Sequence, residues 1–341
     1  MNKSKMDLSL LEKLCNAHGV SGYEDEVAEL IVEIISPFCD TVMKDSVGNI
    51  IAFKKGRKTP EKPIMLCAHM DEVGFSVKHV NDDGTLSFCQ VGMMGTVLPS
   101  KRVLVGKNRL AGVVSSRPVH LSPDKTKACK PEQLVIDIGA KDKAQAEALG
   151  LFGEYAAFDS EFALLGEGLV KAKALDDRVG CAVMCMLARK ELENDVYFAF
   201  TTGEEIGGTG AIAATNRIKP GTALILEGTT ASDLFGYEEK DKVCSPRSGA
   251  VCPFMDGGTM YDNGLYNKML ALAKQNGIKI QTKTKIAGGT DGAKVQRTNL
   301  AVKVIALSLA CRYIHTCASV GSIEDMDSIL TLAELFINSV E

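Results

Sequence analysis

The sequence predicts an α/β fold in which a mixed, largely parallel sheet is flanked by helices and interrupted by a β-rich insertion. Three apolar runs, at 64–68, 197–202 and 223–226, have the length of buried strands. Buried parallel strands are continuous apolar stretches rather than alternating ones. Between residues 73 and 166 the sequence pattern changes to short strand-like segments separated by turns rich in Gly, Pro and Asp. This pattern predicts a separate β-rich part.

The first 72 residues predict the beginning of the main part. Helical apolar spacing extends over 8–16 and 24–36, and strand-like segments at 41–43 and 49–53 surround a turn at Gly48. The first apolar run follows at 64–68. A chain of 341 residues exceeds the usual size of a single core. We therefore expect one large unit formed by 1–72 and 167–341, with residues 73–166 inserted in it.

The α/β pattern resumes after Gly166. A helix is predicted at 177–192, where acidic residues suit the positive end of the helix, and it leads into the strand at 197–202. A long apolar run covers 302–314. Two further helices are predicted at 264–275, ended by Asn276-Gly277, and at 323–340.

Metal-binding side chains end each of the four apolar runs. In an open α/β sheet, ligands bind outside the carboxyl ends of the strands. Another carboxylate, Asp176, stands at the start of a helical pattern. We therefore expect these side chains to meet in one crevice. The strand-end residues are His69, Glu204-Glu205, Glu227 and His315.

The composition of this set predicts a site for two metal ions. Imidazole and carboxylate groups suit zinc and similar divalent ions, and a catalytic site keeps one position open for water. Five ligands are too many for one open catalytic zinc, but they suit two ions that share a bridging carboxylate, roughly 3.5–4 Å apart. The predicted ligands are His69, Asp176, Glu205, Glu227 and His315.

Spacing refines the roles of the neighbouring carboxylates. Asp71, two residues after His69, is placed to accept the second ring proton of the imidazole. Glu204 and Glu205 cannot both aim at one point, so one binds metal and the other accepts a proton from water. Each residue alone has a simpler explanation: an ordinary structural histidine, a solvated Glu-Glu pair, or, for Asp176-Asp177, a helix N-cap. The combination favours the metal site.

Five ordered motifs resemble the M42 metallo-aminopeptidases, which belong to the co-catalytic dizinc peptidases. The resemblance extends over nearly the whole chain and implies hydrolysis of the N-terminal residue of short peptides. It also implies that the insertion is a dimerisation domain and that assembly extends to a tetrahedral dodecamer. The motifs are HMDEVG at 69–74, LDDR at 175–178, GEE at 203–205, EG at 227–228 and RYIH at 312–315.

The resemblance also implies a role for each residue. Asp176 would bridge the two ions, with His69 and Glu227 on one ion and Glu205 and His315 on the other. Glu204 would be the general base, and Asp71 would accept the second ring proton of His69. The glycine-rich segment 288–292 would lie beside the active site, so Gly289, Thr290 and Asp291 are expected to face the substrate.

Two positions depart from the common family pattern. The family often has Asn at the position of Asp177 and Asp at the position of Glu227. Zinc and cobalt are the expected metals and manganese also suits these ligands, so the departures leave the metal and the preferred substrate residue open.

Two other functions compete with the aminopeptidase. A related dizinc amidase or deacylase would cleave acylated substrates and ignore those with a free amine. A non-catalytic assembly protein that keeps the fold would bind no metal. The chemically competent ligands and base argue against the second alternative.

Composition favours a cytoplasmic enzyme. The formal charge is −4, from 39 basic and 43 acidic residues, with no long run of either sign, so neither nucleic acid nor a membrane is an expected partner. Eleven scattered cysteines indicate reduced thiols rather than a disulfide framework. The N-terminus has no hydrophobic signal core, and no apolar stretch approaches the roughly 20 residues that span a bilayer.

Overall fold

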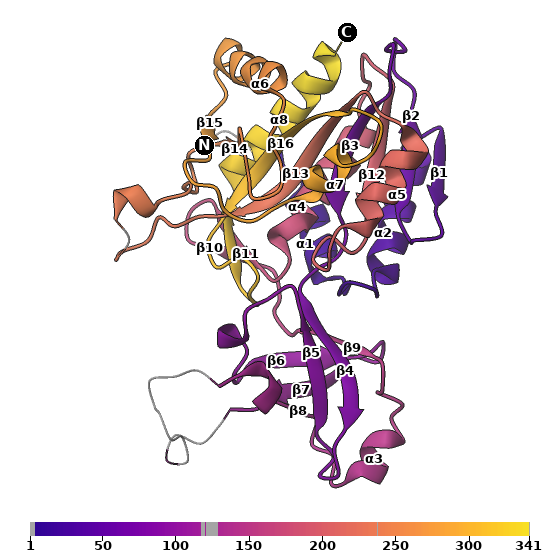
Figure 1. Ribbon diagram of the computed structural model, residues 1–341, viewed down its shortest axis with the longest axis vertical. Helices are drawn as coiled ribbons and strands as arrows, with labels where there is room; N and C mark the ends of the chain where they lie inside the picture. The colour runs from indigo at the N-terminus through magenta and orange to yellow at the C-terminus, as the bar shows by residue number, and fades with distance from the viewer. Residues whose placement is uncertain (1–3, 117–119, 121–128, 237, 341) are drawn as a thin grey trace.

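The computed structural model describes residues 4–116, 120, 129–236 and 238–340. Figure 1 shows a large α/β part above a smaller β part. The predicted fold class is confirmed by an eight-stranded mixed sheet with helices packed against it. The strands, in spatial order, are β1 (Thr41–Lys44), β2 (Ile50–Lys54), β12 (Val196–Thr201), β3 (Ile64–His69), β13 (Thr222–Thr230), β16 (Lys303–Cys311), β14 (Ala250–Cys252) and β15 (Ile280–Thr282).

The four central strands, β12, β3, β13 and β16, are parallel. All six residues of β3 are buried, as are the last four of β12, which explains their continuous apolar sequences. Thr201 is in register with His69, and Glu227 is in register with Ser308. The carboxyl ends of these strands therefore lie on the same side of the sheet, and the segments that carry the predicted ligands follow from them.

All five predicted helices are present. Three shorter helices were not predicted: α3 (Lys143–Glu147), α5 (Thr209–Ile218) and α7 (Asp291–Gln296). In α4 the backbone of Asp176 and Asp177 is not helical, so regular helix begins at Arg178. Within the described residues, no helix has the length and apolar character needed to cross a membrane. The predicted helices are α1 (Leu8–Asn16), α2 (Asp25–Ile35), α4 (Leu175–Ala188), α6 (Asn263–Gln275) and α8 (Ile323–Ser339).

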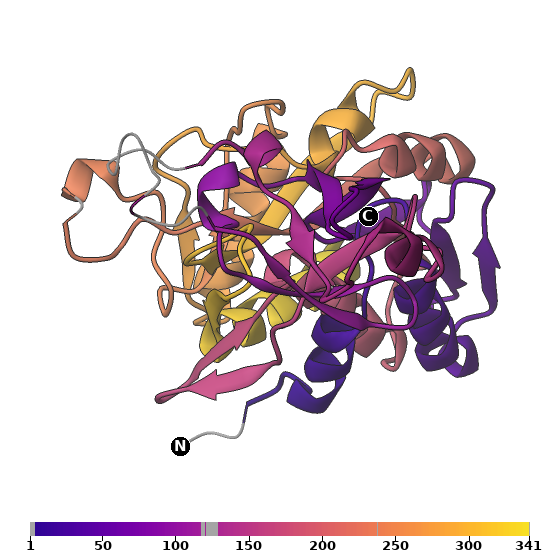
Figure 2. The same ribbon diagram turned by 90° about the horizontal axis from the view of Figure 1, so that it is seen from below.

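Six strands between residues 74 and 158 form a closed barrel, which Figure 2 shows from below. Its core includes Phe75, whose ring packs edge-on against Phe88 and Phe158 at centroid distances of 5.0 and 5.4 Å. A short helix, α3 (Lys143–Glu147), packs against β4. The barrel strands are β4 (Gly74–Val80), β5 (Leu86–Val91), β8 (Ile136–Asp137), β7 (Leu110–Val114), β6 (Arg102–Val105) and β9 (Tyr155–Phe158).

The barrel strands fall inside the predicted insertion of 73–166. The following hairpin, β10 (Ala163–Leu165) and β11 (Leu169–Ala172), lies outside the barrel and pairs with β17 (Ser319–Ser322). The predicted boundary at residue 166 therefore falls in the turn of this hairpin.

A buried ion cluster anchors the segment that connects β3 to the barrel. Glu72 accepts from the Lys173 ammonium and lies 3.5 Å from the Arg178 guanidinium, and all three side chains are almost fully buried. Arg178 Nε also donates to the carbonyl of Met70 at 2.8 Å. Buried charges are tolerated only when they are paired in this way. The cluster therefore fixes the backbone on both sides of Asp71.

His18 lies near this cluster. Because its ring is buried, we expect the free energy of unfolding to decrease in acid. Its ring is buried edge-on against Tyr155, and burial together with the Lys173 charge lowers its pKa to about 4. The unfolded chain binds this proton near pH 6.5, so stability is lost as pH falls from about 6.5 towards 4. We expect His18→Gln to lose less stability than the wild type between pH 7.5 and 5.0, measured as urea midpoints. His79→Gln, at an exposed histidine of β4, is the control. Equal losses in His18→Gln and the wild type would contradict the assignment.

Candidate metal centre

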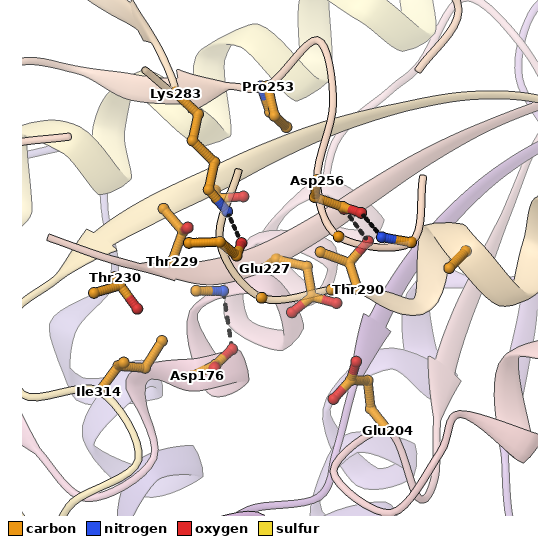
Figure 3. Close-up of a pocket in the computed structure, with 18 of the residues that line it drawn as sticks. Asp176, Glu204, Glu227, Thr229, Thr230, Pro253, Asp256, Lys283, Thr290 and Ile314 are labelled. Atoms are coloured by element: carbon orange, nitrogen blue, oxygen red, sulfur yellow. Dashed lines mark hydrogen bonds between the residues drawn. The ribbon is translucent and has the colours of Figure 1, made fainter. Parts of the chain in front are cut away.

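Four of the five predicted ligands line a cavity of about 640 Å³, and the fifth, His69, is buried behind it against Asp176 and Glu227. Figure 3 shows Asp176 and Glu204 on one side of it and Lys283 and Pro253 on the other. Asp176 comes from the start of α4, Glu204 and Glu205 from the loop after β12, and Glu227 from β13. His315 follows β16 in a left-handed backbone conformation, with φ of +57°, which is uncommon for a residue other than glycine and is often found at functional sites.

Asp176 joins two groups of potential metal ligands. One group is His69, Asp176 and Glu227, and the other is Asp176, Glu205 and His315, with the ligand atoms of each group within 4.8 Å of one another. His69 Nε2 lies 3.3 Å from Asp176 Oδ1, and His315 Nε2 lies 3.3 Å from Asp176 Oδ2. The two carboxylate oxygens thus face different groups, which is the geometry that a bridging ligand requires.

Gly228 holds Asp176 in this position. The Gly228 N–H donates to Asp176 Oδ1 at 2.9 Å, and this hydrogen bond is drawn in Figure 3. A Cβ atom on Gly228 would lie 2.7 Å from the same oxygen. The glycine after Glu227 is therefore required so that β13 can approach Asp176 closely.

The charge balance of the site fits divalent cations. Burial and the adjacent carboxylates raise the pKa of Glu205 to about 7 and that of Glu204 to about 10. Glu205 Oε1 is buried and makes no hydrogen bond in the described part of the chain, although His315 Nε2 lies 3.2 Å from it. Such closely spaced buried carboxylates need positive charge to remain ionised, and a bound metal supplies it. The donor set of two imidazoles and three carboxylates suits zinc, cobalt or manganese.

Asp71 fixes the loop that carries Glu204 and Glu205. Its Oδ1 accepts the Glu204 N–H at 3.0 Å, and its Oδ2 accepts the Glu205 N–H at 3.1 Å and the Ser21 hydroxyl at 2.6 Å. His69 Nδ1 lies 3.1 Å from the Asp71 carbonyl oxygen and 3.4 Å from Oδ1. Asp71 therefore contacts the His69 ring, as expected, and in addition orients both glutamates.

Asp71→Asn is expected to lower kcat by about 10- to 100-fold, the usual cost of losing a residue that orients metal ligands. Each carboxylate oxygen of Asp71 now accepts a backbone N–H, and the NH₂ group of asparagine would face one of these donors instead of accepting from it. Steady-state kinetics should be measured together with metal content. Ser21→Ala is the matched control, because it removes one donor and keeps the carboxylate. Wild-type kcat in Asp71→Asn would contradict this positioning role.

The carboxylate of Glu204 lines the cavity and makes no hydrogen bond or ion pair with the residues described. Asp177 behaves differently, because its Oδ1 accepts the Gly180 N–H at 2.9 Å and caps the regular part of α4. The helix-cap interpretation thus applies to Asp177, whereas Asp176 points to the histidines.

Part of the glycine-rich segment 288–292 lines the cavity. Gly289 and Thr290 line it, and the Thr290 hydroxyl accepts the Gly292 N–H at the start of α7. Asp291 lies behind the cavity: its Oδ2 accepts the Thr201 hydroxyl at 2.7 Å, and its N–H donates to Glu227 Oε1 at 3.3 Å. The side chain of Asp291 therefore contacts the sheet, while its backbone supports Glu227.

Several residues at the site were not predicted. Lys283, Asp256 and Tyr261 line the cavity and stand in sequence segments without a recognisable motif. Gly92, which directly follows β5, lies against Glu205: a Cβ atom there would be 2.6 Å from Glu205 Oε2. This contact between the barrel and a predicted ligand has no local sequence signal.

A largely parallel α/β sheet with grouped histidines and carboxylates at its strand ends is an arrangement typical of metal-dependent hydrolases. Residues 48–332 match the model of the M42 glutamyl aminopeptidase family. The chain is 30% identical to a lysyl aminopeptidase of Pyrococcus furiosus, over 98% of each protein. The chain belongs to the M42 family, and it is accordingly a metal-dependent aminopeptidase.

Solved structures agree with this assignment. An aminopeptidase from Desulfurococcus kamchatkensis superimposes with a TM-score of 0.93 at 31% identity, over 97% of this chain and 94% of that one. The TET1 peptidase of Pyrococcus horikoshii, described as assembling into a tetrahedron or a large octahedral shell, gives a TM-score of 0.86 at 31% identity, over 97% of this chain and 99% of that one.

Proposed function

We propose that the chain removes the N-terminal residue of short peptides at a centre of two divalent metal ions, with Glu204 as the general base. The observation that carries the proposal is the pair of ligand groups that share Asp176. His69 and Glu227 would complete one metal position, and Glu205 and His315 the other. The unpartnered carboxylate of Glu204 beside both groups supports its role as the base.

The metal ions, when bound, would polarise the scissile carbonyl and acidify the attacking water. Glu204 accepts the proton of that water, and the same carboxyl group then returns a proton to the leaving amine. Asp71 holds Glu204 and Glu205 at a fixed separation through their N–H groups. The cavity wall of Gly289 and Thr290 would lie against the substrate.

Assembly would proceed through the barrel, with a tetrahedral dodecamer as the expected form. The barrel region exposes large apolar side chains, among them Met94 at 72% and Phe152 at 73% exposure. Burial of such side chains in a contact between subunits would remove their apolar surface from water. The Pyrococcus horikoshii relative, described as forming a tetrahedron or a large octahedral shell, supports closed assembly, and light scattering after size exclusion would distinguish a dodecamer from a larger shell. The eleven free cysteines suit the cytoplasm, where thiols stay reduced.

The test combines metal analysis with a substrate panel. Protein reconstituted with zinc, cobalt or manganese is assayed on aminoacyl anilides that have a free amine and on their N-acetylated counterparts. About two ions per chain, with cleavage of the free-amine set alone, is the expected result. Cleavage of the acetylated set would favour the deacylase, and absence of bound metal would favour the non-catalytic protein.

A further inference from the structure

We propose that Lys294 and Arg297 bind the C-terminal carboxylate of the peptide, so that the chain acts preferentially on tripeptides and peptides of similar length. This inference rests on the proposed aminopeptidase function and specifies its substrate class. Both cations line the cavity that also contains Asp176 and Glu204. The two ends of a short substrate would then be recognised in one cavity, the scissile bond at the metal ligands and the free carboxylate at α7.

Lys294 and Arg297 lie on the face of α7 that lines the cavity. The lining residues of this segment are Thr290, Ala293, Lys294 and Arg297, and their spacing of i, i+3, i+4 and i+7 is that of one helix face. Exposure increases along this face, because Ala293 is buried, Lys294 is half-buried and Arg297 is exposed. The face therefore runs from the floor of the cavity to its outer edge.

The start of α7 touches a predicted metal ligand. The Asp291 N–H donates to Glu227 Oε1 at 3.3 Å, and Figure 3 shows Thr290, the N-cap of α7, close to Glu227. At a rise of about 1.5 Å per helical residue, Lys294 and Arg297 lie roughly 4.5 and 9 Å farther along the axis than Asp291. These distances place both cations beyond the metal ligands in the direction of the outer edge.

The length of a short peptide matches this spacing. A peptide cleaved at its first bond must leave the cavity towards the outer edge, which is where α7 leads. An extended peptide advances about 3.3 Å per residue, so the carboxylate of a tripeptide lies roughly 7 Å beyond the scissile carbonyl. When the scissile bond lies at the metal ligands, this carboxylate falls between Lys294 and Arg297.

The fold leaves the charged ends of both side chains without a partner. Within the described residues, the side chains of Lys294 and Arg297 form no hydrogen bond and no ion pair. The other lysine of the cavity, Lys283, donates to the Ala287 carbonyl. The stem of Lys294 is nevertheless held in place, since a Cβ atom on Gly208 would lie 2.7 Å from its Cγ. A carboxylate supplies the acceptor oxygens that an ammonium and a guanidinium group bind most strongly.

Lys294 also has an effect on catalysis that the experiment must separate from recognition. Its contact with Gly208 places it beside the loop of Glu204 and Glu205. Loss of its charge near the general base would change the hydrolysis of all peptides alike. Loss of a carboxylate-binding group would affect only peptides with a free C-terminus. The ratio of kcat/KM for a peptide and its C-terminal amide distinguishes the two effects, because the amide has nearly the same size and shape but no charge.

The experiment uses the metal-loaded full chain and measures release of leucine from Leu-Gly-Gly and from its C-terminal amide. The C-terminus is the only anionic group of the free acid, so an acidic side chain does not enter the comparison. We expect the wild type to prefer the free acid by at least about fivefold in kcat/KM, the effect of one charge-assisted hydrogen bond in a half-buried site. Lys294→Met and Arg297→Met should each lower this ratio, and the double variant should bring it to about one.

Methionine keeps the aliphatic stem of Lys294, so the contact with Gly208 is expected to persist. Lys303→Met is the matched control, since Lys303 is exposed at the start of β16, at the opposite end of the parallel strands, and it should keep the wild-type ratio. A ratio that survives in the double variant, or that is lost instead in Lys283→Met, would overturn the inference.

A measurement on the wild type alone covers a variant that fails to fold. The preference for the free acid should fall to within about twofold for a leucyl octapeptide, because its carboxylate lies roughly 23 Å beyond the scissile bond and out of reach of α7. Equal hydrolysis of Leu-Gly-Gly and its amide, or the same preference in the octapeptide, would contradict recognition by α7. Absence of hydrolysis of every peptide, free or amidated, would instead contradict the aminopeptidase function on which the inference rests.

Discussion

Glu204→Gln is expected to reduce kcat by roughly 10²- to 10⁴-fold while the metal content stays near two ions per chain. Glutamine keeps the size of the side chain but cannot accept the proton of the attacking water, and general-base catalysis accounts for roughly 10²- to 10⁴-fold of rate. The N–H of residue 204 would still donate to Asp71, so the loop is expected to keep its position. Kinetics and elemental analysis on the same preparation measure both quantities.

Glu205→Gln is the matched control for Glu204→Gln. Glu205 Oε1 lies 3.2 Å from His315 Nε2, inside one ligand group, so its substitution should lower metal content as well as turnover. Loss of metal in Glu204→Gln with full metal in Glu205→Gln would mean that the two roles are reversed.

Asp176→Asn is expected to lower the occupancy of both metal positions, since each oxygen of the carboxylate faces a different ligand group. The amide oxygen can still accept the Gly228 N–H, so local structure should persist. His315→Ala, by contrast, should affect one position. Elemental analysis after dialysis against a weak chelator measures the ions retained per chain.

Asp177→Asn provides the control at the adjacent position. The Asp177 side chain caps α4 through Oδ1, and an asparagine oxygen can accept the same hydrogen bond. Metal content should therefore stay near the wild-type value. Equal loss of metal in Asp176→Asn and Asp177→Asn would indicate disruption of the start of α4 rather than removal of a bridging ligand.

The sequence predicted the sheet and the candidate ligands because long apolar segments end directly at the ligand residues. Parallel strands must be buried on both faces, so β3, β12 and β13 appear as uninterrupted apolar runs, and their carboxyl ends must lie together. The convergence of His69, Glu227 and the Glu204–Glu205 loop follows from this topology alone.

The elements and site residues that the sequence did not predict depend on contacts between distant segments. The short strands β14 and β15 have three residues each, too few for a periodic signal. Helix α7 contains a glycine and begins at a Thr290 cap within a glycine-rich segment, so it was expected to be a loop. Lys283 reaches the cavity only because β15 pairs with β14. The contacts of Asp71 with the loop after β12 likewise join residues 133 and 134 positions apart.

Gly92 connects the barrel to the candidate metal centre. It belongs to the barrel, yet it touches Glu205, and β4 of the barrel begins five residues after His69. Exchanging or deleting the barrel would remove the backbone that packs against Glu205. Chimaeras between relatives should therefore exchange the barrel together with the loop after β12, so that the contact with Glu205 is kept.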